Sequence, residues 1–384
     1  MSNRDAVVVG AVRTPVGVGK PGRGALDDVH PVDLSAHVIR ALVERTGVQP
    51  ELIEDVVWGC VSQVGEQAFN VARNSALAAG LPESVVGTTV DRQCGSSMQS
   101  LQFAAASVVA GHYDLAVAGG VEVMSRVPMF SNVGGADPYG SMRDRYEGRL
   151  VPQGISAELI AEKWGLSRSY LDGLAATSHE RAAAAQEAGL FGEEIAAVPT
   201  PDGLAARDQG IRPGTTVEKL AGLRTPFKDD GVVTAGNASQ ISDGSAALLV
   251  TTSEKAAELG LTPLVRLHSF ATAGVDPVVM LTGPIPATAK VLQRSSLALS
   301  DIGVFEVNEA FASVLGAWYA ETGADPALTN PLGGAMALGH PLGASGARIA
   351  TTMLHHMRRE GVRYGLQTMC EGGGMANATV FELL

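Results

Sequence analysis

The sequence lacks a long apolar run and has few aromatic residues. A membrane-spanning helix needs roughly 20 apolar residues in succession, and the longest apolar stretch, residues 103–124, is interrupted by His112, Asp114 and Glu122. Aromatic residues make up 5% of the 384 residues and hydrophobic residues 46%, so we expect cores of aliphatic and alanine side chains. The composition predicts two or three packed units and no membrane insertion.

Cysteine is also scarce. The chain has only Cys60, Cys94 and Cys370, an odd and widely spaced set that fits neither a disulfide framework nor a zinc site. We therefore expect reduced thiols and no bound metal, and a reduced thiol can become a nucleophile. Residues 1–5 show no apolar signal segment and Leu383-Leu384 is not a peroxisomal address, which favours a cytoplasmic location.

Positive charge is in deficit, with 28 basic against 40 acidic residues and a net charge of −12. Because no basic run is present, a surface that follows the phosphates of a nucleic acid is not expected. Residues 207–228 are locally basic, and only Asp208 and Glu218 oppose their cations, which are Arg207, Arg212, Lys219, Arg224 and Lys228. Composition alone indicates a solvated loop face here.

Short β-rich runs alternate with helical ones, as in residues 6–9, 32–45 and 56–58, which predicts an α/β layered fold. The order of elements in residues 31–61 recurs in residues 286–307. A second pair agrees, because a strand ending at Cys94 followed by a helix and strand to Gly120 resembles the segment from His340 to Gly374. We favour a duplication over chance similarity between α/β segments.

The segment between the two halves has a different texture. It is rich in glycine, proline and charge over residues 128–152 and then contains two amphipathic helices, residues 156–164 and 169–188. Residues 235–250 are predicted as a strand that rejoins the first half. The domains expected are an N-terminal half at 1–123 completed by 238–260, a loop domain at 124–237 and a C-terminal half at 261–384.

Cys94 lies where a strand gives way to an alanine-rich helix. Free N–H groups and the helix dipole at such a junction favour a thiolate, and the neighbouring Gly95 leaves room for a substrate. A buried, inert cysteine explains Cys94 alone equally well, and it is our default for Cys60.

Three further candidates lie at similar junctions. His340 occupies a glycine-rich turn and could accept a proton, although a structural helix cap is the alternative. Cys370 precedes the glycine run at residues 372–374, whose unobstructed amides could bind an oxyanion or could merely end a strand. Asn308 could be a helix N-cap. Two thiols, an imidazole and an amide at matching junctions are hard to attribute to packing.

Together these motifs resemble the thiolases. That family carries a nucleophilic cysteine before a Gly-Ser pair, then Asn-Glu-Ala-Phe, Gly-His-Pro-x-Gly-x-Ser-Gly and Cys-x-Gly blocks. The chain has all four blocks in this order, at residues 94–96, 308–311, 339–346 and 370–372. The likeness extends to residues 12–15 at the start and to residues 235–239 before the second half. The resemblance implies the thiolase fold, in which two βαβαβαββ halves form five αβαβα layers with an inserted loop domain.

The resemblance also implies an activity, thiolytic cleavage of a 3-oxoacyl-CoA or the reverse condensation, with coenzyme A as co-substrate and no permanently bound cofactor. Cys94 would be acylated with His340 as base, and Cys370 would exchange the α-proton. His340 and a water held by Asn308 would form one oxyanion site, and the N–H groups of Cys94 and Gly372 the other.

The family pattern assigns residues to coenzyme A as well. Ser239 would lie near the pantetheine and Arg212 near the adenine end. Phe311 is also predicted to bind coenzyme A. The pattern also implies a homodimer or a homotetramer.

Several positions depart from short-chain acetoacetyl-CoA thiolases. Residues 152–154 read Pro-Gln-Gly where those enzymes have His-Met-Gly, so we expect room for a larger acyl group. Glu371 stands beside a reactive thiol and could alter its basicity, while Leu332 replaces a usual asparagine and Ala376 a common glycine. The stretches at 91–97, 159–168, 280–288 and 364–376 look most like actinobacterial thiolases of steroid degradation.

Two rival functions remain. A condensing 3-oxoacyl synthase shares the duplicated fold but pairs its cysteine with two histidines, and Cys370 speaks against it. A noncatalytic thiolase-like protein that binds coenzyme A or lipid would be free to lose Cys94, His340 or Cys370, and all three are present.

Overall fold

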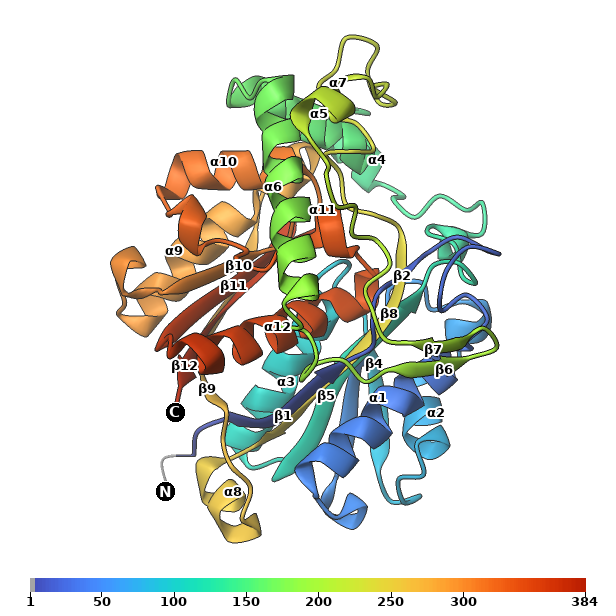
Figure 1. Ribbon diagram of the computed structural model, residues 1–384, viewed down its shortest axis with the longest axis vertical. Coiled ribbons are helices and arrows are strands. Elements are labelled where there is room, and N and C mark those ends of the chain that lie inside the picture. Colours follow the sequence, from blue (N-terminus) through green and yellow to red (C-terminus); the bar gives the residue numbers. More distant parts are fainter. Residues whose placement is uncertain (1–3) are drawn as a thin grey trace.

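The computed structural model describes residues 4–384, in which ten strands form one hydrogen-bonded sheet (Figure 1). Nine of them follow the order β10-β11-β12-β9-β1-β8-β5-β3-β4, and the tenth, β2, pairs with β8. Strands β6 and β7 form a separate hairpin. The strand bounds are β1 Val7–Arg13, β2 Gly17–Val18, β3 Asp55–Gly59, β4 Val86–Val90, β5 Leu115–Val123, β6 Val198–Thr200, β7 Gly203–Ala205, β8 Ser242–Thr251, β9 Val265–Gly274, β10 Val304–Val307, β11 Tyr364–Glu371 and β12 Met375–Leu383.

Helices separate most of these strands along the chain. None of them, within residues 4–384, is long and apolar enough to cross a membrane. Their bounds are α1 Pro31–Thr46, α2 Val71–Ala78, α3 Ser96–Ala110, α4 Met142–Arg145, α5 Gln153–Lys163, α6 Arg168–Glu187, α7 Val217–Ala221, α8 Ser253–Leu259, α9 Pro284–Ser295, α10 Ala312–Thr322, α11 Ala335–Leu338 and α12 Ser345–Glu360.

Helices α3 and α12 form the middle layer of the fold. Leu101 of α3 and Met353 of α12 share one buried cluster with Val57 of the first half and Phe381 of the second, so the two halves of the sheet path face each other across these helices. The halves are joined by a short pairing of β1 with β9. With α1 and α2 on one outside face and α9 and α10 on the other, the predicted five-layer fold is confirmed (Figure 1).

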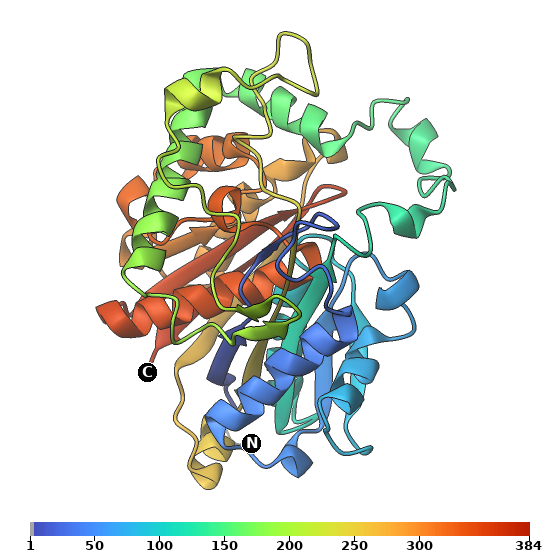
Figure 2. The same ribbon diagram turned by 45° about the vertical axis from the view of Figure 1, so that its right-hand side comes forward.

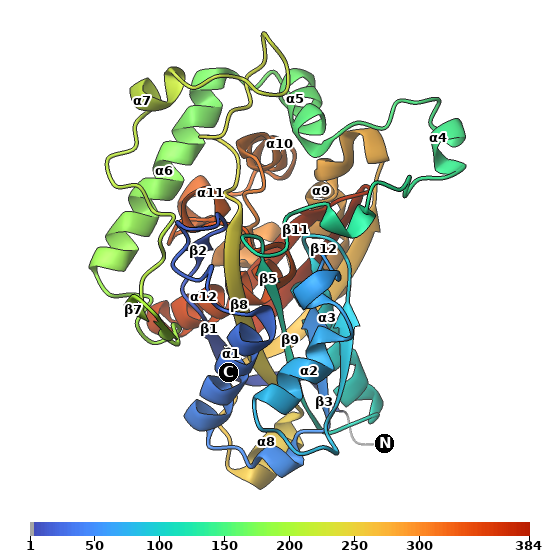
Figure 3. The same ribbon diagram turned by 90° about the vertical axis from the view of Figure 1, so that its right-hand side faces the viewer.

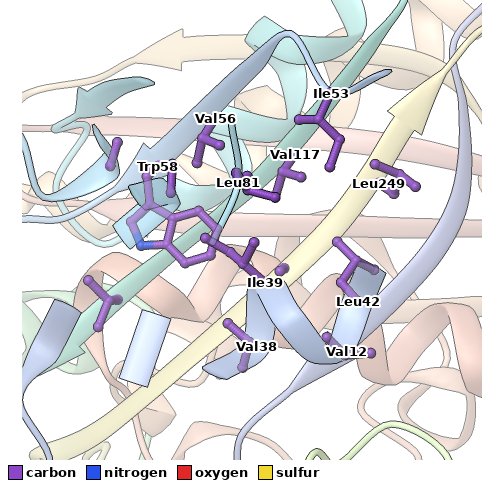
Figure 4. Close-up of a cluster of buried hydrophobic side chains, with 14 of the residues drawn as sticks. Val12, Val38, Ile39, Leu42, Ile53, Val56, Trp58, Leu81, Val117 and Leu249 are labelled. Atoms are coloured by element: carbon purple, nitrogen blue, oxygen red, sulfur yellow. The ribbon is translucent and has the colours of Figure 1, made fainter. Parts of the chain in front are cut away.

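The outer layer of the first half shows why these sequences form these elements. Helix α1 begins with proline, which its first turn tolerates, and ends at Gly47, whose φ of 68° suits a residue without a Cβ. Its buried side chains, among them Val38 and Leu42, recur on one face and pack on the β3 residues Val56 and Trp58 (Figure 4). On β3, Val57 points the opposite way, into the middle layer, as the twofold period of a strand requires.

The duplication predicted from the sequence is present. A helix, a 3₁₀ turn and a parallel strand follow one another as α1, Pro50–Leu52 and β3, and again as α9, Leu299–Asp301 and β10. The second pair is α3 with β5 and α12 with β11. As expected for face-to-face helix starts, the Ala347 N–H donates to Ser97 Oγ at 2.9 Å.

The strand predicted at residues 235–250 was placed too early. Strand β8 does rejoin the first half, pairing antiparallel with β1 and β5, but it begins at Ser242. The preceding residues turn toward the second half instead, because the Ser239 N–H donates to the Ala310 carbonyl at 2.9 Å and Ala238 bridges to Phe311.

Residues 124–237 contain α4 to α7 and the β6–β7 hairpin. Helix α6 lies across α10 and α11, whereas the segment around α4 projects away from the sheets (Figures 2 and 3). Arg13, at the end of β1, ties this segment to the core. Its guanidinium donates to Glu194 at 2.6 Å and to Asp208 at 2.7 and 2.9 Å, and it lies over the Phe191 ring.

This buried ion pair generates a stability prediction. Arg13→Met would leave the carboxylates of Glu194 and Asp208 buried without their cation, which costs about 3–5 kcal/mol. Chemical denaturation should therefore show a much lower midpoint for this variant. Arg143→Ala, which removes an exposed ion pair with Asp137, should leave the midpoint nearly unchanged. Equal effects of the two substitutions would contradict the anchoring role of Arg13.

Candidate functional site

Cys94 is held in the tight turn between β4 and α3. The Arg92 N–H donates to Ser96 Oγ at 2.9 Å, and that hydroxyl donates to the Gln93 carbonyl at 2.6 Å. Gln93 adopts a φ of 48°, in the left-handed region that non-glycine residues seldom occupy. The turn leaves Cys94 only 4% exposed. A conformation of this kind is maintained only when the surrounding structure determines it, and it is common at functional sites.

The turn that carries His340 is drawn onto the first half by Glu122. This buried carboxylate at the end of β5 accepts from the Gly343 N–H at 2.8 Å and also receives three donors from the segment after β3. A Cβ at Gly343 would lie 2.5 Å from the Val121 carbonyl and 2.7 Å from Cys60 Cα, so the close approach requires glycine. Cys60 is fully buried beneath this turn, in agreement with its predicted packing role.

The hydrogen bonds around His340 define which ring nitrogen carries the proton. Ser345 Oγ donates to the Pro341 carbonyl at 2.8 Å, so it must accept from His340 Nδ1, 2.5 Å away. The lone pair is then on Nε2, which faces Asn308 Nδ2 at 3.3 Å. Burial and the positive charge of Arg348 lower the pKa of His340 to about 3. His340 is therefore a neutral imidazole whose unprotonated Nε2 faces the Asn308 amide, and it is not a helix cap.

Asn308 follows β10 directly and also does not cap a helix. The N-cap of α10 is Phe311, three residues later. Asn308 is 1% exposed, and its Oδ1 has no hydrogen-bond partner within residues 4–384. The chain before it is fixed by Asn330, whose amide both accepts from and donates to the Val307 backbone at 2.9 Å. The side-chain nitrogen of Asn308 therefore faces His340, and its carbonyl oxygen has no donor among residues 4–384.

The two thiols and Gly372 meet in one electrostatic environment. The N–H groups of Cys94 and Gly372 both act to lower the pKa of the Cys94 thiol, and a Cβ at Gly372 would lie 3.1 Å from Oε1 of Gln93, the residue before Cys94. Burial raises the pKa of Cys370, and the charge of Cys94 adds to that rise. The structure thus brings together Cys94, Cys370 and Gly372, which lie far apart in the sequence.

Burial outweighs the preference for a thiolate that the sequence predicts at this helix start. Burial, followed by the charge of Glu371, raises the pKa of Cys94 to about 12 despite the two N–H groups. The next amides of the helix start are also engaged, since the Gly95 and Ser96 N–H groups donate to the carbonyls of Arg92 and Gln93 at 3.1 and 3.0 Å. Desolvation therefore outweighs the helix dipole, and Cys94 rests as a thiol.

The residues predicted to bind coenzyme A are only partly gathered. Ser239 and Phe311 lie side by side through the backbone pairing described above, and Phe311 contacts Phe227 edge to face at 6.3 Å. Arg212 is exposed elsewhere on the loop domain, where its backbone N–H donates to His179. No contact given by the structure for residues 4–384 joins Arg212 to the other two.

Sequence reasoning missed two kinds of residue at this site. Ser345 belongs to the same Gly-His-Pro-x-Gly-x-Ser-Gly block as His340, so the five-residue separation could have indicated that the two side chains are partners. Gln93 and Gln153 could not, because they approach Gly372 from different segments. A Cβ at Gly372 would lie 3.1 Å from Gln93 Oε1 and 3.3 Å from Gln153 Nε2, so these two amides flank the backbone at Gly372.

A metal centre finds no support in the part of the chain that the structure covers. Within residues 4–384, no group of three or more His, Cys, Asp or Glu side chains is arranged to hold a metal ion. The site thus consists of two buried thiols, a neutral imidazole, an amide and glycine backbone. This set suits nucleophilic and proton-transfer chemistry on an acyl compound.

Comparison with known proteins gives a consistent picture. A family model described as "Thiolase, N-terminal domain" matches residues 6–254, and one described as "Thiolase, C-terminal domain" matches residues 261–383. The steroid 3-ketoacyl-CoA thiolase FadA6 of Mycobacterium tuberculosis is 49% identical, over 99% of this chain and 94% of that protein. The 3-ketoacyl-CoA thiolase of Bacillus subtilis is 43% identical, over 99% and 100%.

A solved structure agrees in three dimensions. The crystal structure of the Bacillus anthracis acetyl-CoA acetyltransferase superposes with a TM-score of 0.90 at 39% identity, over the full length of both chains.

The state of His340 can be measured directly. We predict that ¹⁵N-histidine NMR will show His340 with protonated Nδ1 and unprotonated Nε2 from pH 8 down to 5, since its pKa is about 3. Its pKa in the unfolded chain is about 6.5. The unfolded chain therefore takes up a proton that the folded chain does not, and this group removes stability as pH falls from 6.5 toward 3. Titration of His340 above pH 6 would contradict the assignment.

Proposed function

We propose, from the premise that this chain belongs to the thiolase family, that Cys94, His340 and Cys370 carry out its acyl transfer between a 3-oxoacyl-CoA and coenzyme A. The family and the acyltransferase activity follow from the full-length similarity to thiolases. The assignment of roles is our own. The observation that supports it most is that the turn of Cys94 adjoins Glu371 and Gly372, the two residues that follow the second thiol, Cys370.

The first step needs a base because Cys94 rests as a thiol. His340 Nε2, which is unprotonated and faces Asn308 Nδ2, would take the Cys94 proton as the sulfur attacks the 3-oxo carbon of the substrate. The developing alkoxide would be stabilised by His340, now protonated, and by a water held on Asn308. Asn308 Oδ1, buried without a protein donor, is suited to accept from such a water.

Carbon–carbon cleavage then requires a proton donor. When the bond between C2 and C3 breaks, its electron pair passes to the acetyl unit, and Cys370 would donate a proton to C2 and become a thiolate. The enolate oxygen formed during this step would accept from the N–H groups of Cys94 and Gly372. The products are acetyl-CoA and an acyl thioester on Cys94.

Coenzyme A closes the cycle. Its thiol would give its proton to the Cys370 thiolate and attack the Cys94 thioester, and Cys94 would recover its proton from His340. Every proton lost in the first half-reaction is thereby returned, and no other cofactor enters. In reverse, Cys370 would remove the α-proton of acetyl-CoA.

Coenzyme A is proposed to lie along the loop domain, with Ser239 and Phe311 near the pantetheine and Arg212 toward the phosphate-bearing end. One feature supports the last part. Asp208, counted in the sequence against the basic residues of 207–228, is buried against Arg13, so it does not neutralise the exposed cations of this segment. Among the exposed charged side chains of this segment only Glu218 is negative, and of the cations only Lys228 lies near carboxylates of the described chain, those of Glu162 and Asp230. The other cations are suited to the phosphates of coenzyme A.

For the acyl group we propose a bulky, ring-bearing chain such as one derived from a steroid. Two observations support this choice. The chain is 49% identical to a steroid 3-ketoacyl-CoA thiolase, and the residue that flanks Gly372 from α5 is Gln153, within the Pro-Gln-Gly that replaces His-Met-Gly.

We propose a cytoplasmic homodimer or homotetramer as the working form. Strand β4 lies at the edge of the sheet path, and Val86 on it is 57% exposed. The nearby Phe69 is 92% exposed. An apolar sheet edge of this kind is normally covered, and a second copy of the chain would cover it.

The roles of the two thiols can be distinguished by comparing the full reaction with the exchange of coenzyme A. We predict that Cys94→Ala abolishes both thiolysis of a 3-oxoacyl-CoA and exchange of labelled coenzyme A into a simple acyl-CoA. Cys370→Ala should lose thiolysis by a hundredfold or more, the scale of a missing acid–base group. It should lose much less of the exchange, which moves a proton only at the coenzyme A sulfur and none at C2. Wild-type protein with neither activity and no adduct would instead favour a noncatalytic coenzyme A or lipid-binding protein.

The acyl pocket can be tested by substitution. We predict a higher kcat/KM for ring-bearing 3-oxoacyl-CoAs than for acetoacetyl-CoA in the wild type. Gln153→Trp, which enlarges the side chain beside Gly372, should lower kcat/KM for the ring-bearing substrate far more than for acetoacetyl-CoA. A wild-type preference for acetoacetyl-CoA would reject the bulky acyl group.

A further inference from the structure

Glu371 places a carboxyl group beneath the nucleophile. It is the residue after Cys370 on β11, and successive side chains of a strand point to opposite faces. Its side chain reaches the turn that holds Cys94, because a Cβ at Gly95 would collide with Glu371 Oε1 and lie 2.8 Å from Asn377 Nδ2. One carboxyl thus adjoins Cys370 along the chain and Gly95, the neighbour of Cys94, in space.

This carboxyl is buried without a partner. Glu371 is 0% exposed, and neither oxygen has a hydrogen-bond partner within residues 4–384. An ionised carboxylate in such a place would carry a large desolvation cost, whereas a protonated acid carries much less. Burial accordingly raises the pKa of Glu371 to about 8.

The charged neighbours do not neutralise it. In the turn before α3, Arg92 lowers the pKa of Glu371 and Asp91 raises it. Arg92 forms no salt bridge with Glu371 within residues 4–384, and its Nη1 lies against Met375 Sδ at 3.9 Å. The β12 side chains that adjoin this place, Met375 and Asn377, carry no charge. The two thiols lie nearby, and the buried carboxyl of Glu122 also raises the pKa of Cys94, by less than Glu371 does.

We propose that Glu371 is a positioning residue that acts through Cys94: its carboxyl must be protonated for Cys94 to form a thiolate readily, and its ionisation opposes thiolate formation at both Cys94 and Cys370. As a neutral acid it packs against Gly95 at little electrostatic cost. As an anion it adds a like charge beside two sulfurs that must each become negative during the reaction. Negative charge on Glu371 raises the pKa of both thiols.

The inference rests on the proposed role of Cys94, and alkylation tests it without turnover. The rate of carbamidomethylation by iodoacetamide would be measured on the Cys94 peptide by mass spectrometry from pH 6.5 to 9.5. A thiol with a fixed pKa far above this range gains thiolate tenfold per pH unit. In the wild type the alkylation rate should rise by less than tenfold per pH unit between pH 7 and 9, because Glu371 ionises in this interval. In Glu371→Gln the rise should remain tenfold per pH unit throughout.

The two proteins should therefore react equally at pH 6.5 and differ by about tenfold at pH 9, the effect of one pKa unit, with Glu371→Gln the faster. Glu371→Asp should keep the flattened wild-type profile, and Glu360→Gln, which changes an exposed carboxylate at the end of α12, should match the wild type. A ratio between wild type and Glu371→Gln that is constant with pH would reduce Glu371 to a packing residue and overturn the proposal. If the wild type itself shows no exchange of labelled coenzyme A into an acyl-CoA, the proposed function is refuted instead.

Discussion

Exclusion of water from the sulfurs and the imidazole is the constraint on which the site depends. Cys94, Cys370 and His340 are each at most 4% exposed, and burial is the largest influence on the pKa of each. All three groups are consequently neutral at rest. In the proposed mechanism, a proton therefore has to move from Cys94 to His340 as charge develops on the substrate. The direction of each hydrogen bond then matters as much as the identity of each residue.

The fold provides this dry environment by burying the turns of two similar halves against each other. Helices α3 and α12 start side by side in the middle layer, and Glu122 draws the His340 turn onto the end of β5. The loop domain then covers the second half and is fixed to β1 by the buried Arg13 cluster. The site therefore depends on ion pairs and carboxylates that touch no reacting atom.

Much of this arrangement could be predicted from the sequence, because the candidate residues lie within motifs at strand-to-helix junctions of a duplicated pattern. Cys94, His340 and Asn308 are predicted as site residues in that way, and so is the order of the elements. The charge state of Cys94 could not be predicted, because the sequence shows the helix start but not the distant segments that bury it, and burial decides the pKa of the thiol. Contacts between distant segments were equally hidden, such as Glu371 with Gly95 and Gln153 with Gly372. The predicted start of β8 was too early because the residues before Ser242 pair with the second half, where the Ser239 N–H donates to the Ala310 carbonyl.

The central claim is that Cys94 carries the acyl group in a step that precedes attack by coenzyme A. It is tested most directly by mixing the protein with a 3-oxoacyl-CoA in the absence of free coenzyme A. The account predicts a burst of one acetyl-CoA per site and a stoichiometric acyl mass on the Cys94 peptide. Acetyl-CoA release without an adduct, or an adduct on Cys60 or Cys370 in place of Cys94, would contradict it.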